Sequence, residues 1–198
     1  YCSSNALSGL DVSKNLELEK LNCSNNNGNH LGALNLNNNT KLTELYCAYD
    51  KLSVSELDVS KNIALTKLYC YRSNLTKLDV SNNLALEELN CWGNNLNELD
   101  VSKNTALTKL YCDENDLSEL DVRNNTALTE LDCRENSLTE LDISQNTELT
   151  KLYCDQNKLT KLDVSQHREL QHLSCNKNQL TALNLNENAF SASYTTIY

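Results

Sequence analysis

Residues 91–112 read CWGNNLNELDVSKNTALTKLYC, and this stretch decides the fold because the chain repeats it from end to end. Its cysteine recurs as Cys2, Cys23, Cys47, Cys70, Cys91, Cys112, Cys133, Cys154 and Cys175. Six of the eight intervals are 21 residues long, and the other two, of 24 and 23 residues, contain short insertions. A fixed period of about 20 to 50 residues is typical of proteins built from stacked repeats. We therefore expect each unit to pack only against its two neighbours.

Within each unit, leucine and asparagine hold fixed places, which in this stretch are Leu96, Leu99, Leu107, Leu110, Asn94 and Asn104. The unit L-x-x-L-x-C-x-x-N-x-L, followed by x-x-L-D-V-S-x-N-x-x, resembles the leucine-rich repeat with cysteine at its sixth position. The resemblance covers residues 2–188, almost the whole chain. A leucine-rich stack with a cysteine column is similar to the internalin J-type surface proteins of bacteria.

The two halves of each unit predict two short strands. The triplets L-x-C and L-D-V alternate inward and outward, as side chains do along a strand. The connections between them are too short for a helix of any length. We predict an all-β, right-handed leucine-rich repeat solenoid of about nine 21-residue coils, with short strands on both sides.

The ends of the chain break the repeat. It opens at Tyr1 and Cys2, in the middle of an expected strand, and residues 189–198 lose the period. We assign residues 1–188 to the solenoid and residues 189–198 to a C-terminal cap or the start of a following domain. Because an open solenoid end exposes leucines and strand edges, we expect the chain to be part of a longer protein that carries a leader and an anchor.

The regular columns have structural explanations. Asparagines at the turns are expected to bond the backbone of their own coil and the next. The residue three before each cysteine alternates in charge along the stack, as Lys20, Glu44, Lys67, Glu88, Lys109, Glu130 and Lys151, which favours one register. The cysteines are odd in number and show no C-x-x-C spacing, so we interpret them as buried, free and unreactive thiols.

Composition argues against several functions. The 198 residues include 27 acidic and 17 basic side chains, a net charge of −10, which disfavours nucleic-acid and anionic-membrane binding. No apolar run approaches the roughly 18 residues of a membrane span. The sequence contains no hydrolase, metalloprotease, phosphate-loop or dinucleotide motif. We expect no enzyme, no catalytic residues, no metal, no cofactor and no membrane insertion, and we expect a monomer.

Aromatic residues gather on the outward positions of the L-x-C strand. We propose a ligand-binding face made of Tyr46, Tyr49, Tyr69, Tyr71, Arg72, Trp92, Tyr111 and Tyr153, with those of the middle coils forming one contiguous patch. Tyrosine, tryptophan and arginine are the side chains that anchor protein interfaces. The alternative is a structural ladder, because tyrosine favours strands and stacks across them.

Two functional hypotheses follow. The resemblance to internalins implies a secreted or cell-surface adhesion protein, and the leading hypothesis is a binding module for a protein or glycan. The alternative is a structural spacer that displays a neighbouring domain.

On the opposite strand, Asp58, Asp79, Asp100, Asp121 and Asp142 belong to an acidic column whose like charges need compensation, from backbone donors, from lysines or from a cation such as calcium.

Overall fold

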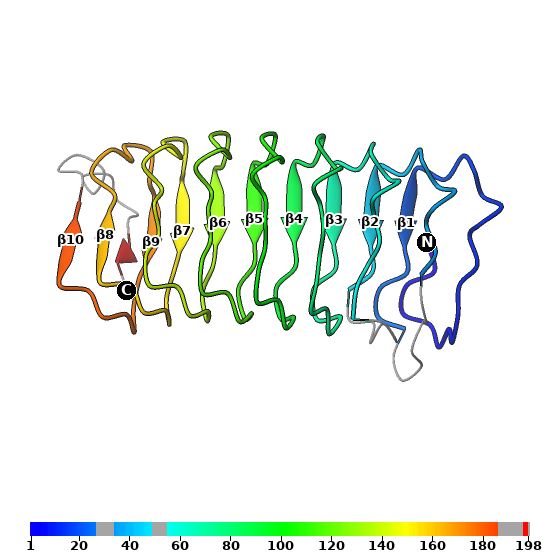
Figure 1. The fold of residues 1–198 in the computed structure, drawn as a ribbon, viewed down its shortest axis with the longest axis horizontal. Coiled ribbons are helices and arrows are strands. Elements are labelled where there is room, and N and C mark those ends of the chain that lie inside the picture. The colour runs from blue at the N-terminus through cyan, green and yellow to red at the C-terminus, as the bar shows by residue number, and fades with distance from the viewer. Residues whose placement is uncertain (27–33, 49–54, 186–195, 198) are drawn as a thin grey trace.

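The computed structural model describes residues 1–26, 34–48, 55–185 and 196–197, and these residues contain strands and turns but no helix. Parallel strands of three residues follow one another along the stack (Figure 1). They are β1 (Lys20–Asn22), β2 (Glu44–Tyr46), β3 (Lys67–Tyr69), β4 (Glu88–Asn90), β5 (Lys109–Tyr111), β6 (Glu130–Asp132), β7 (Lys151–Tyr153) and β9 (His172–Ser174). The predicted all-β solenoid is confirmed.

The coil count needs correction. Eight strands spaced along the repeat, β1 to β7 and β9, enclose about seven turns rather than the nine predicted from nine cysteines. The coil of Cys2 has no strand and joins the stack through backbone hydrogen bonds, such as Cys2 N to Asn22 O at 2.8 Å, and through apolar side chains such as Leu7 and Leu10 that pack against the core. The ninth strand of the long sheet, β11 (Thr196–Ile197), comes from beyond the repeats and pairs with β9.

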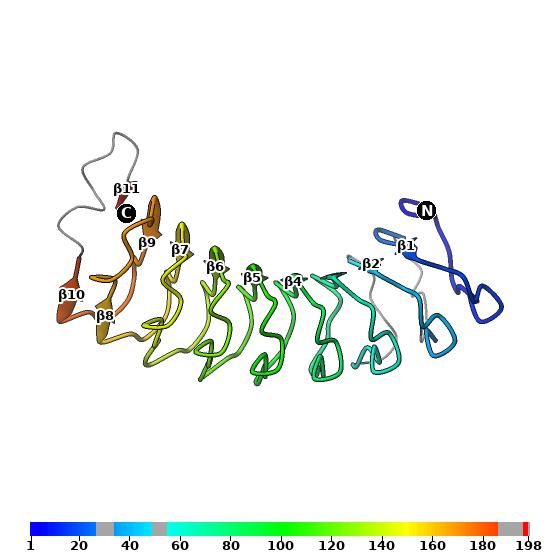
Figure 2. The same cartoon turned by 90° about the horizontal axis from the view of Figure 1, so that it is seen from above.

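The opposite side of the solenoid has far less strand than predicted. There, β8 (Lys161–Asp163) pairs with β10 (Ala182–Asn184), and a single bridge joins Glu56 to Lys77. Figure 2 shows the resulting shape, a stack that curves with the long sheet along its inner side. Hydrogen bonds hold the strands of the long sheet about 4.8 Å apart. The outer side mostly lacks this constraint, so its turns spread.

The core is a stack of identical layers. In the long sheet each central leucine pairs with a leucine of the next strand, as Leu68 does with Leu89 and Leu89 with Leu110, and all three are fully buried. The repeat leucines, the valines of the outer side and the cysteines form one continuous cluster. Since each layer buries its apolar face only against its neighbours, the core is as long as the stack.

The cysteine column lies inside this core, as predicted. All nine cysteines are free, and all but Cys2 are buried. Thiols such as those of Cys112 and Cys154 donate to backbone carbonyls of the next coil, at 3.5 and 3.4 Å. Burial raises the pKa of Cys70 to about 12, so its thiol stays protonated near neutral pH.

Two asparagine columns close the turns. In the first, Asn94 Nδ2 donates to Cys70 O and Cys91 O, while its Oδ1 accepts from the backbone of Ser73 and Leu75. In the second, amides such as that of Asn104 donate to two carbonyls of the preceding coil, and their Oδ1 atoms have no partner. The predicted structural role of asparagine is confirmed.

The domain division remains a prediction. Residues 186–195 and 198 lie outside the described part of the chain, which leaves only Thr196 and Ile197 of the 189–198 segment. Their parallel pairing with His172 and Leu173 places β11 at the C-terminal edge of the long sheet.

Candidate functional site

The inner face of the long sheet presents the residues on either side of each buried leucine. In its charged row, Lys67 Nζ lies 2.9 Å from Glu88 Oε1, and Lys151 Nζ lies 3.1 Å from Glu130 Oε1. Lys109, whose register places it between Glu88 and Glu130, belongs to none of the ion pairs found in the described part of the chain. The row confirms the predicted alternation and supports one register.

The tyrosines that precede the cysteines form a second row. The rings of Tyr46 and Tyr69 stack with centroids 4.9 Å apart, and Tyr69 Oη donates to Glu88 Oε2. Tyr111 Oη donates to the glutamate of the following coil, at 2.7 Å. Burial, and then this hydrogen bond, raises the pKa of Tyr111 above its usual value. These hydroxyls are therefore tied to the charged row.

The row of tyrosines that precede the cysteines is not continuous. The register sets Tyr69 opposite Asn90, and Asn90 opposite Tyr111, so an asparagine interrupts the tyrosine row. Among the described residues, the stacked rings occur as two pairs, Tyr46 with Tyr69 and a second pair described next. Tyr49, a further predicted site residue, lies outside the described residues.

The second pair is built from residues that follow the cysteines. The rings of Tyr71 and Trp92 stack with centroids 5.5 Å apart, and the guanidinium of Arg72 lies 4.3 Å from the centre of the Trp92 ring. Arg72 also reaches Glu114, at 3.4 Å. Tyr71 and Trp92 are half-buried, whereas Arg72 is exposed. Cation–π contacts of this kind contribute about 0.5–1 kcal/mol at exposed positions.

Gly93 makes room for this arrangement. Most residues at its place in the coil have a positive φ, among them Arg72 at 51° and Glu114 at 50°. Gly93 shares this conformation with a φ of 66°, and a Cβ atom there would lie 2.8 Å from Arg72 Cγ. Because Gly93 has no side chain, the side chain of Arg72 can pass over it and cover the Trp92 ring.

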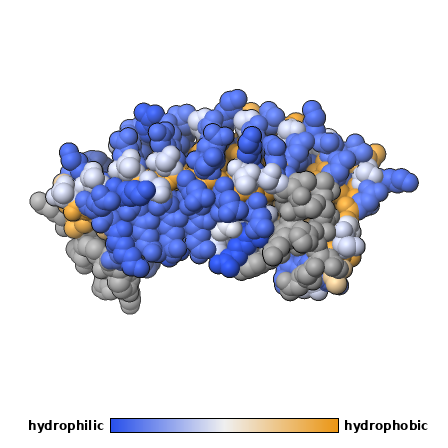
Figure 3. Space-filling model, turned by 60° about the horizontal axis from the view of Figure 1, so that its bottom comes forward, coloured by the Kyte–Doolittle hydropathy of each residue, from blue (hydrophilic) through white to orange (hydrophobic). Residues whose placement is uncertain are grey.

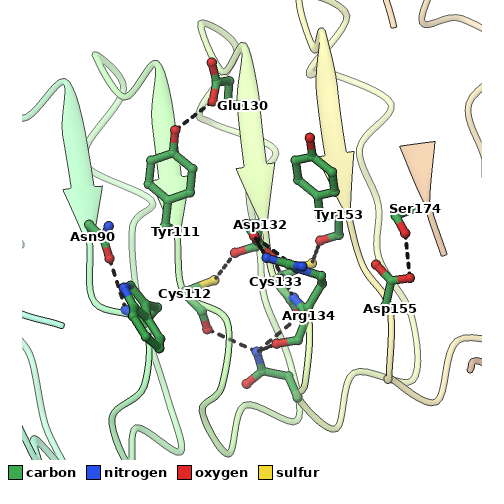
Figure 4. A network of polar contacts seen from close by, with 12 residues as sticks. Asn90, Tyr111, Cys112, Glu130, Asp132, Cys133, Arg134, Tyr153, Asp155 and Ser174 are labelled. Carbon is green, nitrogen blue, oxygen red and sulfur yellow. Dashed lines mark hydrogen bonds and ion pairs between the residues drawn. The ribbon is translucent and has the colours of Figure 1, made fainter. Parts of the chain in front are cut away.

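Toward the C-terminal end of the same face, an arginine and aspartates lie beside the rings of Tyr111 and Tyr153 (Figure 4). Arg134 binds both oxygens of Asp132, through Nη2 to Oδ2 at 2.6 Å and Nε to Oδ1 at 2.8 Å, and its guanidinium lies 5.3 Å from the Tyr153 ring centre. Asp132 is 6% exposed. The two-point contact desolvates and fixes the carboxylate.

Asp155 lies one coil further and uses only one of its oxygens. Its Oδ1 accepts from Ser174 Oγ at 2.6 Å, Asn176 N at 3.0 Å and Asn176 Nδ2 at 2.9 Å. Its Oδ2 is buried without a partner. A hollow of about 250 Å³ beside it is lined by Arg134, Glu135, Asp155, Gln156, Ser174, Asn176 and Lys177.

Asp113 stands between the ring pair and the arginine. Burial, and then the charge of Asp132, raises the pKa of Asp113 to about 7. The residues after cysteine in successive coils therefore run from Tyr71 and Trp92 through Asp113 and Arg134 to Asp155. Over these five coils, two aromatic residues are followed by two carboxylates with an arginine between them.

The site proposed from the sequence omitted the acidic half, namely Asp113, Asp132, Asp155 and the hollow. The signal was available, because these carboxylates occupy the same columns, next to the cysteines, as the predicted tyrosines. In a sequence, aromatic side chains are the stronger sign of an interface, whereas an aspartate on a strand face looks like ordinary solvated charge.

The acidic column of the outer side finds its compensation in the backbone. Each aspartate accepts from the backbone N–H two residues later, as Asp79 does from Ser81 at 2.8 Å and Asp142 from Ser144 at 3.0 Å. This backbone hydrogen bond lowers the pKa of Asp142 below its usual value. Backbone donors therefore compensate the charges along the column, and Arg123 adds an ion pair to Asp121 at 2.7 Å. In the described residues, no group of three or more His, Cys, Asp or Glu side chains is arranged around a metal position.

The face drawn in Figure 3 is largely hydrophilic, with hydrophobic residues visible mainly in small areas between polar side chains. No helix within the described residues is long and apolar enough to cross a bilayer.

Comparison with known proteins gives structural matches. No protein-family model matches the sequence, and none of the curated proteins matches it. The functional domain of InlJ from Listeria monocytogenes, which includes a cysteine ladder, is 40% identical, with a TM-score of 0.85 over 93% of this chain and 43% of that one. Internalin C2 from the same organism is 17% identical, with a TM-score of 0.74 over 95% of this chain and 84% of that one.

The structure of a plant protein has a similar fold. The ectodomain of the receptor kinase GASSHO1/SCHENGEN3 from Arabidopsis thaliana, solved in complex with CASPARIAN STRIP INTEGRITY FACTOR 2, is 22% identical, with a TM-score of 0.67 over 96% of this chain and 29% of that one. This chain spans less than half the length of the InlJ structure. The two matches below 25% identity establish the fold alone.

Proposed function

The chain is an internalin-like leucine-rich repeat protein with a cysteine ladder, and from this premise we propose that it binds a protein or glycan partner with the inner face of its long sheet. Leucine-rich repeat domains of this kind are interaction modules, and the solenoid offers a wide and rigid surface. We further propose that the protein is secreted or displayed at a cell surface, where it would act in adhesion.

One observation supports the inner face above all. Tyr71, Trp92 and Arg72 form a preassembled cluster in the middle of the stack, held by two coils and by the space at Gly93. Rigid aromatic and arginine side chains supply contact area at a low entropic cost. The rest of the proposed face comprises Tyr46, Tyr69, Tyr111, Tyr153 and, outside the described residues, Tyr49.

The tyrosines differ in how free their rings and hydroxyl groups are to contact a partner. Tyr69 and Tyr111 commit their hydroxyls to glutamates, and Tyr153 lies under Arg134. These rings serve the structural ladder as well, so their loss should reduce stability and binding together. Tyr71 and Trp92 are therefore the positions that separate binding from folding most cleanly.

The experiment compares three versions of the immobilised chain in a binding screen of extracellular proteins and a glycan array. They are the wild type, a Tyr71→Ser/Trp92→Ser variant, and an outer-side control with Asn97→Ser and Glu98→Gln. We expect a saturable partner that the control retains and the ring variant loses, while all three stay folded by circular dichroism. Binding that persists in the ring variant, or no saturable binding to any version, contradicts the proposal and favours the spacer alternative.

A further inference from the structure

The charged row of the inner face leaves one ammonium group without a partner. Glu88 accepts one hydrogen bond from Lys67 at Oε1 and another from Tyr69 at Oε2. Glu130 likewise accepts from a lysine at Oε1 and from a tyrosine at Oε2. Lys109 lies between these glutamates in the register, yet among the described residues its ammonium has neither an ion pair nor a hydrogen bond.

A second free donor lies next to Lys109. On this face, the tyrosine before one cysteine reaches the charged residue of the following coil, as Tyr69 reaches Glu88. In the next coil Asn90 takes the place of that tyrosine, and the charged residue that follows it is Lys109. An amide nitrogen and an ammonium are both donors, so the bond that joins tyrosine to glutamate is not repeated here.

The orientation of the Asn90 amide is fixed by its own strand. Its Oδ1 accepts from the backbone N–H of Trp92 at 3.4 Å, and Figure 4 shows its nitrogen on the side away from this contact. Asn22 and Asp132 use the same contact in their coils. Among the described residues, Asn90 Nδ2 therefore remains a donor without an acceptor.

Both donors are open to solvent. Asn90 and Lys109 are half-buried, and neither Asn90 Nδ2 nor Lys109 Nζ is among the buried side-chain atoms that lack a partner. Lys67, Lys109 and Lys151 are the half-buried lysines of the described residues, and Lys109 alone lacks an ion pair. A group from outside the chain can therefore reach both nitrogens.

From this geometry we propose that Lys109 and Asn90 together bind the carboxylate of an aspartate or glutamate of the protein partner. The inference deepens the function proposed above and rests on it. Diagonal neighbours on a sheet face lie about 7–8 Å apart, a span that these two side chains can close around one carboxylate. One carboxylate oxygen accepts from Nζ and the other from Nδ2, and the charge strengthens both hydrogen bonds.

The local charge favours an anion, although the chain as a whole is acidic. The five charged positions centred on Lys109 hold three lysines and two glutamates, an excess of one positive charge. Both glutamates are paired, and Asp132 in the neighbouring row is paired with Arg134. Asp113 carries less charge than an ordinary carboxylate near neutral pH, because its pKa is raised to about 7. More distant charges are screened within about 8 Å at physiological salt.

The ring cluster beside this pair favours a peptide over an acidic sugar. A sugar packs against an open ring face, whereas the Trp92 ring is stacked with Tyr71 and covered by Arg72. Asn90 and Trp92 are alternate residues of one coil, and alternate side chains of an extended peptide lie about 6.6 Å apart. One peptide segment can therefore place an acidic residue at Asn90 and an apolar residue two positions away on the rings.

The test observes both donors directly. The full chain, labelled with ¹⁵N and ¹³C, is titrated at constant ionic strength with the peptide acetyl-Glu-Ser-Leu-amide, while the Asn90 side-chain amide and the Lys109 ε-methylene resonances are recorded. The same peptide with glutamine in place of glutamate is the uncharged control, and the methyl glycoside of N-acetylneuraminic acid presents a carboxylate on a sugar. We expect saturable shifts at both residues with the glutamate peptide, and an affinity at least about tenfold lower for the other two probes.

Two variants remove one donor each. Lys109→Gln should lose binding, whereas Lys103→Gln, which removes an exposed lysine from the turn before β5, should bind as the wild type does. Asn90→Asp keeps the acceptor for the Trp92 backbone but replaces the donor with a charged oxygen, so it should also lose binding. All three should keep the circular dichroism and the Tm of the wild type within a few degrees.

The opposite outcomes are equally distinct. No saturable shift at Asn90 and Lys109, an equal response to the glutamine peptide, or an equal loss in Lys103→Gln overturns the inference. A tighter response to the sugar than to the glutamate peptide overturns the choice of a peptide.

The peptide titration does not depend on the natural partner. Saturable binding of the glutamate peptide, with no partner found in the screen, would contradict the proposed function alone. A partner that is lost by Tyr71→Ser/Trp92→Ser but kept at full affinity by Lys109→Gln would contradict the carboxylate site alone.

Discussion

The side chain of Arg72 passes through the space where Gly93 would carry a Cβ atom, since such an atom would stand 2.8 Å from Arg72 Cγ. This relationship places the guanidinium over Trp92, 4.3 Å from the ring centre. The cluster proposed to bind a partner therefore depends on a residue that contributes no side chain.

Gly93→Ala should separate Arg72 from the Trp92 ring. The new methyl group forces the arginine aside, and alanine at positive φ adds about 1 kcal/mol of strain. Trp92 is the only tryptophan, so its fluorescence reports this site alone, and its emission maximum should move to longer wavelength as the ring becomes wetter. Glu135→Gly, at the equivalent place with a φ of 51°, is the control and should leave the emission unchanged. An unaltered Gly93→Ala spectrum would show that the contact does not depend on the glycine.

Asp113→Asn should stabilise the protein at alkaline pH. Because the pKa of Asp113 is raised to about 7, the folded chain keeps a proton that the unfolded chain has released above about pH 4. The wild type therefore loses stability as pH rises from about 4 to about 7, and the variant does not. We expect a gain on the order of 2 kcal/mol at pH 8 and almost none at pH 4, with solvent screening reducing the effect.

Urea unfolding at the two pH values measures this difference. Asp116→Asn, an exposed carboxylate of the same coil, serves as the matched control and should change stability by less than about 0.5 kcal/mol. Equal gains for Asp113→Asn at pH 4 and pH 8 would falsify the assignment of a buried, repelled carboxylate.

His167→Asn should complete the second asparagine column, in which His167 takes the place of an asparagine. His167 occupies the place of Asn104 and Asn146 but makes one side-chain contact, from Nε2 to Ile143 O at 3.1 Å, where each asparagine makes two. Its Nδ1 is buried without a partner. The replacement should add about 0.5–1.5 kcal/mol to the free energy of unfolding near neutral pH.

The gain from His167→Asn should grow in acid. Burial lowers the pKa of His167 in the folded chain, so the unfolded chain takes up the proton first as pH falls through about 6.5. The wild type is then progressively destabilised, whereas the variant has no such group. Thermal unfolding from pH 7.5 to pH 5 checks the trend, and curves that stay parallel would argue that the ring is solvated.

Thiol labelling should distinguish one cysteine from the rest. Cys2 is partly exposed, while the other eight are buried in the core. Burial raises the pKa of Cys70 and Cys133, which suppresses the reactive thiolate. Mass spectrometry after iodoacetamide treatment should find one label on the native wild type, none on Cys2→Ser, and full labelling in denaturant. Rapid native labelling at Cys112 would mean that the stack opens locally.

The sequence by itself determined the architecture and the columns. The period, the leucine spacing and the residues beside each cysteine place Leu68 and Cys70 in the core and Tyr69 on the inner face. They do so because a stacked repeat gives every unit the same environment and a 21-residue interval allows only one register. The number of complete turns and the curve of the stack were not readable, since they depend on how the end coils pair and on how few hydrogen bonds join the outer side.

Only the tertiary structure decided what the columns do. It covers Trp92 with Arg72, turns Arg134 toward Asp132 and leaves one buried oxygen of Asp155 without a partner. Those outcomes come from rotamers and from competition among neighbours in different coils for the same donors. A repeat pattern fixes the position from which each side chain leaves the backbone, whereas the partner of that side chain depends on all the other groups within reach.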